Sequence, residues 1–400
     1  MNNPQKLSLL ALALAVAFAT QPAAASELAD AISNGKTNLD LRLRYEQVDQ
    51  DNALKDALAL TLRARLGYQT AALSGWSAGI EFEANETVDG DYNSTTNGET
   101  TYSVIADPEY QEINQAYIVY QGFADTTLKY GRQRLVLDNH RFIGNVGWRQ
   151  NEQTFDGLSV NNKSLANTTI TFAYLSNANR IFGDDHPLGD YRMQSPIINI
   201  KYDGFALGAL SGYGYFLNFD DNANLSTSTI GLRFAGQFKP SGEQAWHYAA
   251  EFARQQDYAD NPASFDLDYL LLDFGWQHQS VQINLKHEVL SGNGAQAFQT
   301  PLATLHAFNG WSDQFLTTPA NGLVDNQLVF SATIAGIKLI AELHDFSADR
   351  GGGDYGSEFG LLANKSWTKQ FATGLKLAQY QADDFSVDTD KLWLWAEFKF

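Results

Sequence analysis

The sequence predicts an antiparallel β-barrel of about 18 strands that crosses a membrane. Three observations support this fold class: the last ten residues alternate strictly between two kinds of side chain, similar runs recur along the whole chain, and the connections alternate between short and long. Each run is about ten residues long, which is the length that a tilted strand needs to cross hydrocarbon.

The closing stretch, residues 391–400, reads KLWLWAEFKF. One set of alternate positions is entirely apolar, namely Leu392, Leu394, Ala396, Phe398 and Phe400. The other set carries Trp393, Trp395, Glu397 and Lys399. Because successive side chains of a strand point to opposite faces, one face suits hydrocarbon and the other tolerates water. This strand alone would also suit a sheet packed on a soluble core, so the rest of the chain has to decide.

The same alternation begins the chain, at residues 38–47, 58–69 and 76–85. In 58–69, for example, the leucines alternate with Thr61, Arg63 and Arg65. With the closing strand, these runs make about eighteen, an even number, as expected for an outer-membrane barrel. The further predicted strands are 112–121, 126–134, 154–161, 168–175, 196–203, 207–217, 227–239, 246–255, 266–278, 281–290, 325–335, 337–345, 356–365 and 370–381.

The connections alternate in length along the chain. Short turns are predicted near 70–75, 122–125, 162–167, 204–206, 240–245, 279–280, 336 and 366–369. Long loops are predicted near 48–57, 86–111, 135–153, 176–195, 218–226, 256–265, 291–324, 346–355 and 382–390. This asymmetry is the signature of an outer-membrane barrel with short periplasmic turns and long extracellular loops. We expect one barrel domain, residues 26–400.

The N-terminal 25 residues have the pattern of a secretory signal peptide. Lys6 precedes an apolar run at 7–19, and three alanines at 23–25 suit a cleavage site. The apolar run is too short for a membrane-spanning helix. We therefore expect export, and a final location in the bacterial outer membrane.

Composition limits the partners. The formal net charge is −19, which argues against nucleic acid, and the absence of cysteine excludes disulfides and thiolate metal sites. We expect no cofactor and no bound metal. The expected partners are outer-membrane lipid and a solute, an acidic sugar or another small anion, and we expect a monomer rather than a trimer.

Residues 128–157 interrupt the alternation and carry several arginines. Either Gly131 introduces a bulge, or the arginines lie at a rim beyond the hydrocarbon. An arginine-lined constriction is one hypothesis, because guanidinium groups bind carboxylates bidentately and keep their charge. Bracing of the wall by ion pairs with nearby acids is the other. The candidate pore-lining residues are Arg42, Arg44, Arg63, Arg65, Arg132, Arg134, Arg141 and Arg149.

A second unusual stretch, residues 298–325, is too apolar and aromatic for a solvated loop. We expect it to pack inside the barrel mouth or to cap it, because long loops with this composition are rarely disordered.

Catalysis and calcium binding are weaker alternatives. His140 beside Asp138, and His306 with Asp313, are candidate hydrolase pairs, but the chain has no G-x-S-x-G motif. We therefore predict that the protein is not an enzyme. The acidic cluster Asp184, Asp185 and Asp190 could bind calcium, although we interpret it as a solvated loop.

Seven short motifs resemble the alginate export family of outer-membrane barrels. They are RLRYE at 42–46, YGRQR at 130–134, DNHRF at 138–142, GWRQ at 147–150, TFD at 154–156, FNGW at 308–311 and TTPANG at 317–322. The resemblance implies an eighteen-stranded barrel that passes an anionic uronate polysaccharide through an arginine-rich pore, lined by Arg132, Arg134, Arg141 and Arg149.

One departure from that family bears on the direction of transport and on the size of the transported solute. An exporter of this kind is expected to gate its pore with a long periplasmic turn near the C-terminal end, whereas the turn at 366–369 is short. This favours a simpler channel for acidic sugars or small anions. A channel for neutral solutes with structural arginines, and an outer-membrane hydrolase, are the alternatives.

Overall fold

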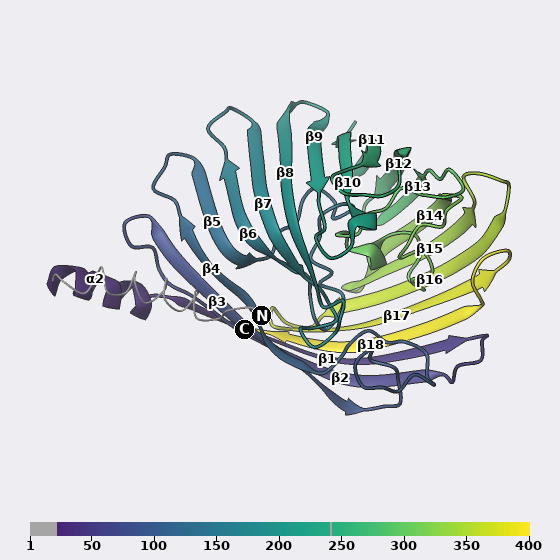
Figure 1. Ribbon diagram of the computed structural model, residues 1–400, viewed down its shortest axis with the longest axis horizontal. Helices are drawn as coiled ribbons and strands as arrows, with labels where there is room; N and C mark the ends of the chain where they lie inside the picture. The colour runs from purple at the N-terminus through teal and green to yellow at the C-terminus, as the bar shows by residue number, and fades with distance from the viewer. Residues whose placement is uncertain (1–21, 241) are drawn as a thin grey trace.

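The computed structural model describes residues 22–240 and 242–400, and its strands form one closed antiparallel barrel (Figure 1). Each strand pairs with its neighbours in sequence, and β1 pairs with β18. The strands are β1 Lys36–Gln50, β2 Ala57–Gln69, β3 Trp76–Asp89, β4 Tyr110–Tyr120, β5 Thr126–Gln133, β6 Thr154–Asn162, β7 Thr168–Asn179, β8 Asp190–Phe205, β9 Gly208–Leu217, β10 Thr227–Phe238, β11 Gln244–Asp257, β12 Asp266–His278, β13 Val281–Leu290, β14 Leu323–Ile334, β15 Ile337–Ser347, β16 Asp354–Ser366, β17 Phe371–Ala382 and β18 Thr389–Lys399.

The predicted fold is confirmed strand by strand. Each of the eighteen expected runs corresponds to one strand, and most ends agree within a few residues. The largest difference is β8, which begins at Asp190 rather than at 196. The closing strand lies against β1 as expected, and the backbones of Phe400 and Leu39 exchange two hydrogen bonds of 2.8 Å.

The alternation of side chains sorts the two faces of the wall. On β2, Leu62 and Leu66 face outward and are exposed, whereas Arg63 and Arg65 face the lumen and are buried. The outward face therefore suits lipid hydrocarbon, and the lumen carries the polar groups.

The ends of the barrel differ as predicted. Two-residue turns at 279–280 and 335–336 lie at one end, whereas the longest loops, 90–109, 134–153 and 291–322, all lie at the other. Two single-turn 3-10 helices lie in long loops, η1 Ala223–Leu225 and η2 Leu305–Ala307.

The N-terminal segment precedes the barrel. Helix α2, Pro22–Ser33, leads into β1 and projects from the wall (Figure 1). The predicted signal peptide, residues 1–25, lies mostly outside the described residues. Within the described part of the chain, no helix combines the length and apolar character needed to cross a membrane.

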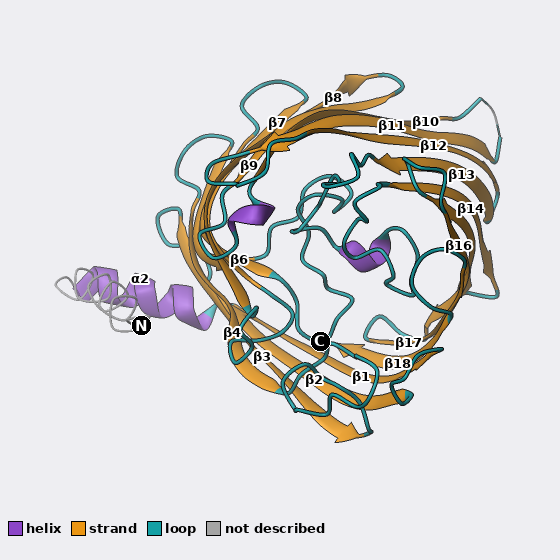
Figure 2. Ribbon diagram, turned by 45° about the vertical axis from the view of Figure 1, so that its right-hand side comes forward, coloured by secondary structure: helices purple, strands orange, loops and turns teal. Residues whose placement is uncertain are grey.

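Two long loops fill much of the lumen (Figure 2). We call residues 134–153 the first inner loop and residues 291–322 the second inner loop. Phe142 of the first and Phe298 of the second pack together, 6.1 Å between ring centroids, against Tyr269 of the wall. The second inner loop thus packs inside the barrel, as its aromatic composition predicts.

Candidate functional site

The two inner loops join each other in the middle of the lumen. The amide of Gly144 donates to the carbonyl of Leu302 at 2.9 Å, and the amide of Thr304 donates to the carbonyl of His140 at 3.1 Å. The side-chain amide of Gln153 also donates to Leu302, at 3.0 Å. Because these bonds are mostly between backbones, the loops form one crosspiece, which we call the constriction.

Arginines of β1 hold the first inner loop by its carbonyl groups. Arg42 donates through Nε to Oε1 of Gln150 at 2.8 Å, through Nη1 to the carbonyl of Gly147 at 3.2 Å, and to the carbonyl of Arg149. Arg44 donates to the carbonyl of Trp148 at 2.7 Å. In a solvated loop, water molecules would donate hydrogen bonds to these carbonyl groups. Here the arginine side chains are fixed donors in place of water.

Arg149 connects the wall to both inner loops. Its Nη1 lies 3.0 Å from Glu46 on β1, and its Nη2 lies 3.1 Å from Asp313 in the second inner loop. Lys391 on β18 also contacts Asp313, at 3.1 Å. All of these side chains are buried and share partners, so they form one charged network that joins the wall to both loops.

Arg141 has a similar role on the opposite wall. It donates to Glu288 on β13 at 2.7 Å, to Thr300 at 3.0 Å and to Asn309 at 3.1 Å. Its guanidinium also lies 4.8 Å from the ring centroid of Phe308. Arg141 therefore binds the wall and the second inner loop at once.

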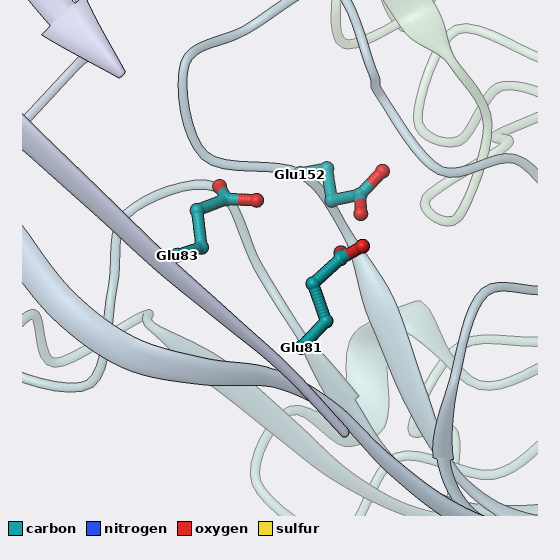
Figure 3. Close-up of side chains that lie close together, drawn as sticks. All are labelled: Glu81, Glu83 and Glu152. Atoms are coloured by element: carbon teal, nitrogen blue, oxygen red, sulfur yellow. The ribbon is translucent and has the colours of Figure 1, made fainter. Parts of the chain in front are cut away.

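Three carboxylates converge beside β3, with candidate ligand oxygens within 4.8 Å of one another: Glu81, Glu83 and Glu152 (Figure 3). They make the one such acidic or imidazole group in residues 22–240 and 242–400. Arg134 pairs with Glu81 and Glu152, and Arg65 pairs with Glu83. Because each of the three carboxylates already pairs with one of two guanidinium groups, which would repel a cation, the cluster does not fit a metal ion.

Arg132 lies on the other side of the wall. It shares the outward face of β5 with Tyr130, and it pairs with Asp156 on β6 at 3.0 Å. No register shift is seen at Gly131. The pairing therefore gives no sign of a bulge at Gly131, and Arg132 lies on the outward face of the wall rather than in the lumen.

The remaining seven candidate arginines belong to the first inner loop, contact it, or, for Arg63, lie opposite Arg42 in the wall. They are Arg42, Arg44, Arg63, Arg65, Arg134, Arg141 and Arg149. Six are buried, and Arg134 keeps the most solvent contact, with 32% of its side chain exposed. Their contacts are those that the bracing hypothesis expects, while their position around the constriction is what the selectivity hypothesis requires.

One buried group was not anticipated from the sequence. The ammonium of Lys376 on β17 lies 3.9 Å from the ring centroid of Trp311 and 4.5 Å from that of Trp148. It donates to Nε2 of His306 at 2.8 Å. The sequence did contain a signal for this group, because Lys376 is a charged residue at a lumen-facing position between Leu375 and Leu377. Its aromatic partners, however, come from distant segments of the chain.

Of the two candidate catalytic pairs, one is formed in the structure and the other is not. His306 and Asp313 do pair, at 2.7 Å, but the other imidazole nitrogen faces Lys376 rather than a nucleophile. Burial lowers the pKa of His306 to about 3, although Asp313 opposes that shift. Burial alone would raise the pKa of Asp313, but His306, Lys391 and Arg149 hold it well below its usual value.

The second candidate pair is not formed. The carboxylate of Asp138 accepts hydrogen bonds from Asn199, at 2.5 Å, and from Ser211, at 2.7 Å, whereas Nδ1 of His140 faces Thr304 at 3.4 Å. In the described ranges, the aspartates at 184, 185 and 190 do not form a group close enough to share a cation. Their interpretation as a solvated loop therefore stays the simpler one.

Comparison with known proteins agrees with this architecture. The model of a family described as alginate export matches residues 29–257. No curated protein matches the chain. Among solved structures, OccAB2 of Acinetobacter baumannii has a TM-score of 0.72 at 15% identity, covering 93% of this chain and 99% of its own. OccK5 (OpdH) of Pseudomonas aeruginosa has a TM-score of 0.71 at 13% identity, covering 92% and 99%. At these identities, the likeness to solved structures shows the fold.

Proposed function

The chain belongs to the alginate export family, and we propose that it is a passive outer-membrane channel for anionic solutes, chiefly short acidic sugars of the uronate type. The closed barrel supplies a complete lumen by itself, which supports a monomer as the working unit. The constriction is the element past which a solute must move.

The observation that carries the anion preference is the surplus positive charge at Arg42. On the paired strands β1 and β2, Arg42 lies directly opposite Arg63. Arg63 pairs with Asp40 at 2.6 Å, but among the described residues no acid lies within ion-pair distance of Arg42. Its charge is solvated by carbonyl-type oxygens alone. An uncompensated charge in a low-dielectric wall raises the local concentration of anions in the lumen.

The size of the solute follows from the inner loops. They cross the lumen and bond to each other, and the turn between β16 and β17 spans residues 367–370 only. A fixed crosspiece without a long periplasmic gate suits mono- and oligosaccharides better than a continuous polymer.

The burial of the arginines favours a second candidate function. Arg44 and Arg63 are 1% exposed and pair with acids, so they could serve to hold the constriction alone. The protein would then be a channel for neutral or mixed solutes, with structural arginines.

Ion selectivity in planar bilayers distinguishes the two functions. The purified protein is placed in a KCl gradient, and the sign of the reversal potential is measured. We expect anion preference, weakened in Arg42→Gln, which keeps a hydrogen-bond donor for the loop but removes the charge. Arg192→Gln is the matched control, because Arg192 is exposed on an outer rim and pairs with Asp221.

Solute uptake provides the second measurement. Liposomes containing the protein should swell faster in glucuronate than in glucose. Cation preference in the wild type, or equal potentials in wild type and Arg42→Gln, would contradict the anion proposal and support the channel with structural arginines.

A further inference from the structure

The barrel wall is incomplete between β4 and β5. These strands pair only between Ala116–Tyr120 and Leu128–Arg132, because β5 is eight residues long. On its other side, β4 pairs with β3 as far as Tyr110. The part of β4 before Ala116 therefore has no strand partner toward β5, and Arg132 fills the space by donating to the carbonyl of Ile113 at 3.0 Å.

A groove of about 1030 Å³ lies at this defect. Small residues keep it hollow. Gly131 has φ +122, and a Cβ atom there would lie 2.3 Å from the carbonyl oxygen of Ala116, so this position requires glycine. The outward apolar residues that line the groove are Ala64, Leu66, Phe82, Ala84, Ile113, Ala116 and Tyr130.

The groove changes character along its length. Phe82 and Leu66 are lipid-facing positions of the outward face, and Tyr130, 56% exposed, follows on β5. Arg132 makes the lining polar past Tyr130 on β5, and Glu112, the register partner of Glu83, reaches the groove from the lumen side of β4. The groove therefore joins an apolar part on the outward face to a polar part at the gap between β4 and β5.

The polar end carries a surplus of negative charge. Arg132 is already paired with Asp156. Glu112 accepts one hydrogen bond from Asn151, at 2.8 Å, and Asp184 has no ion-pair partner within the described ranges. Two carboxyl groups are thus left for a ligand, and their charge selects a cation rather than a phosphate.

We propose that this groove binds one amphiphile, with its alkyl chain along Leu66, Phe82 and Ile113 and an ammonium headgroup at Glu112 and Asp184. Burial of a chain in the hollow stabilises the complex by the hydrophobic effect, and the ammonium compensates the two carboxyl groups. The ligand would also cover the part of the wall where hydrogen bonds between strands are missing.

Native mass spectrometry of the full-length protein in octyl glucoside tests this proposal. The probes are dodecylammonium and dodecyl sulfate, which share one chain and differ in headgroup charge. We expect one dodecylammonium to remain bound to the protein, and dodecyl sulfate to be retained at least tenfold less. Retention of both probes to the same extent would show only a general detergent belt and would overturn the proposal, as would preference for the sulfate.

Two variants locate the site. Ala116→Trp fills the groove and should abolish retention, whereas Ala341→Trp, at an outward alanine of β15 away from the groove, should not. Asp184→Asn changes a loop residue without a fold requirement and should reduce retention of dodecylammonium at least fivefold. Unchanged retention in both Ala116→Trp and Asp184→Asn would place the ligand elsewhere and overturn the proposal. A doubled protein mass that only Ala116→Trp abolishes would also overturn it, because the groove would then bind a second copy of the chain.

Discussion

The imidazole of His306 stacks on the indole of Trp148, with ring centroids 4.8 Å apart and planes 6° from parallel. Trp148 belongs to the first inner loop and His306 to the second. The carbonyl of Trp148 accepts from Arg44 on β1, and His306 accepts from Lys376 on β17. This stack therefore links the two loops to each other and to the same side of the wall, because β1 and β17 both pair with β18.

Removing the indole should open the channel. Trp148→Ala loses the stack with His306 and the cation–π contact with Lys376, at about 0.5–1.5 kcal/mol for the aromatic pair alone. We expect a larger and noisier single-channel conductance in planar bilayers, because the second inner loop is held less firmly. Trp76→Ala, at a lipid-facing tryptophan, is the control. Equal conductance of Trp148→Ala and wild type would show that the stack does not hold the loops.

Acid should open the channel in the same way. The groups that face His306 are Asp313, Lys376, Arg149, Trp148 and Trp393. Because the pKa of His306 is lowered from 6.5 to about 3, the contribution of this neutral imidazole to the stability of the constriction is fully present above pH 6.5. Below that value the released loop binds the proton better, and stability falls by about 1.4 kcal/mol per pH unit. The lowered pKa of Asp313 acts in the same direction at still lower pH.

The measurement is conductance between pH 7.5 and pH 4. We expect a rise as the pH falls below 6.5 in the wild type. His306→Phe keeps a ring on Trp148 but cannot be protonated, so it should show a flat profile in this range. A wild-type profile that is equally flat would contradict a role of this imidazole in the pH response.

Loss of Arg141 should be severe, and it should be rescued by a second change. Arg141→Met leaves the carboxylate of Glu288 buried without its cation, at a cost of about 3–5 kcal/mol. We expect faster hydrogen exchange at the amides of residues 300–309. In the double variant Arg141→Met with Glu288→Gln, the unpaired charge is gone and much of the protection should return. Additive effects of the two changes would argue against direct coupling.

Neighbouring residues of β13 test which face meets lipid. Leu285 points outward and is 62% exposed, whereas Asn284 points into the lumen and donates to Asp273 at 2.7 Å. Leu285→Arg should lower the free energy of unfolding by about 2–4 kcal/mol in lipid bilayers. Asn284→Arg should cost much less. Urea unfolding of both variants in lipid vesicles provides the comparison, and equal losses would argue against a membrane-facing wall at Leu285.

Much of the wall was predictable because its signal is local. In a run such as 281–290, alternation alone predicts which side chains share a face, and the predicted ends agree with those of β13. The composition of the two inner loops shows that they are unusual, but it does not predict that they contact each other or the wall. Arg141 and Glu288 are 147 residues apart, and no spacing rule indicates that they meet. Arg132 shows the limit within one strand, since its charge suggested the lumen while its parity with Tyr130 placed it outward.

The sequence by itself determined a closed barrel, the side of the wall on which most strand residues lie, and the end at which the long loops emerge. These follow from a period of two and from loop length, which are properties of neighbouring residues. Only the tertiary structure decided whether an arginine meets water or a carbonyl. That depends on where the first inner loop lies in the lumen. Contacts with β1, β3 and β13 set the position of that loop, and no local pattern of 134–153 predicts those contacts.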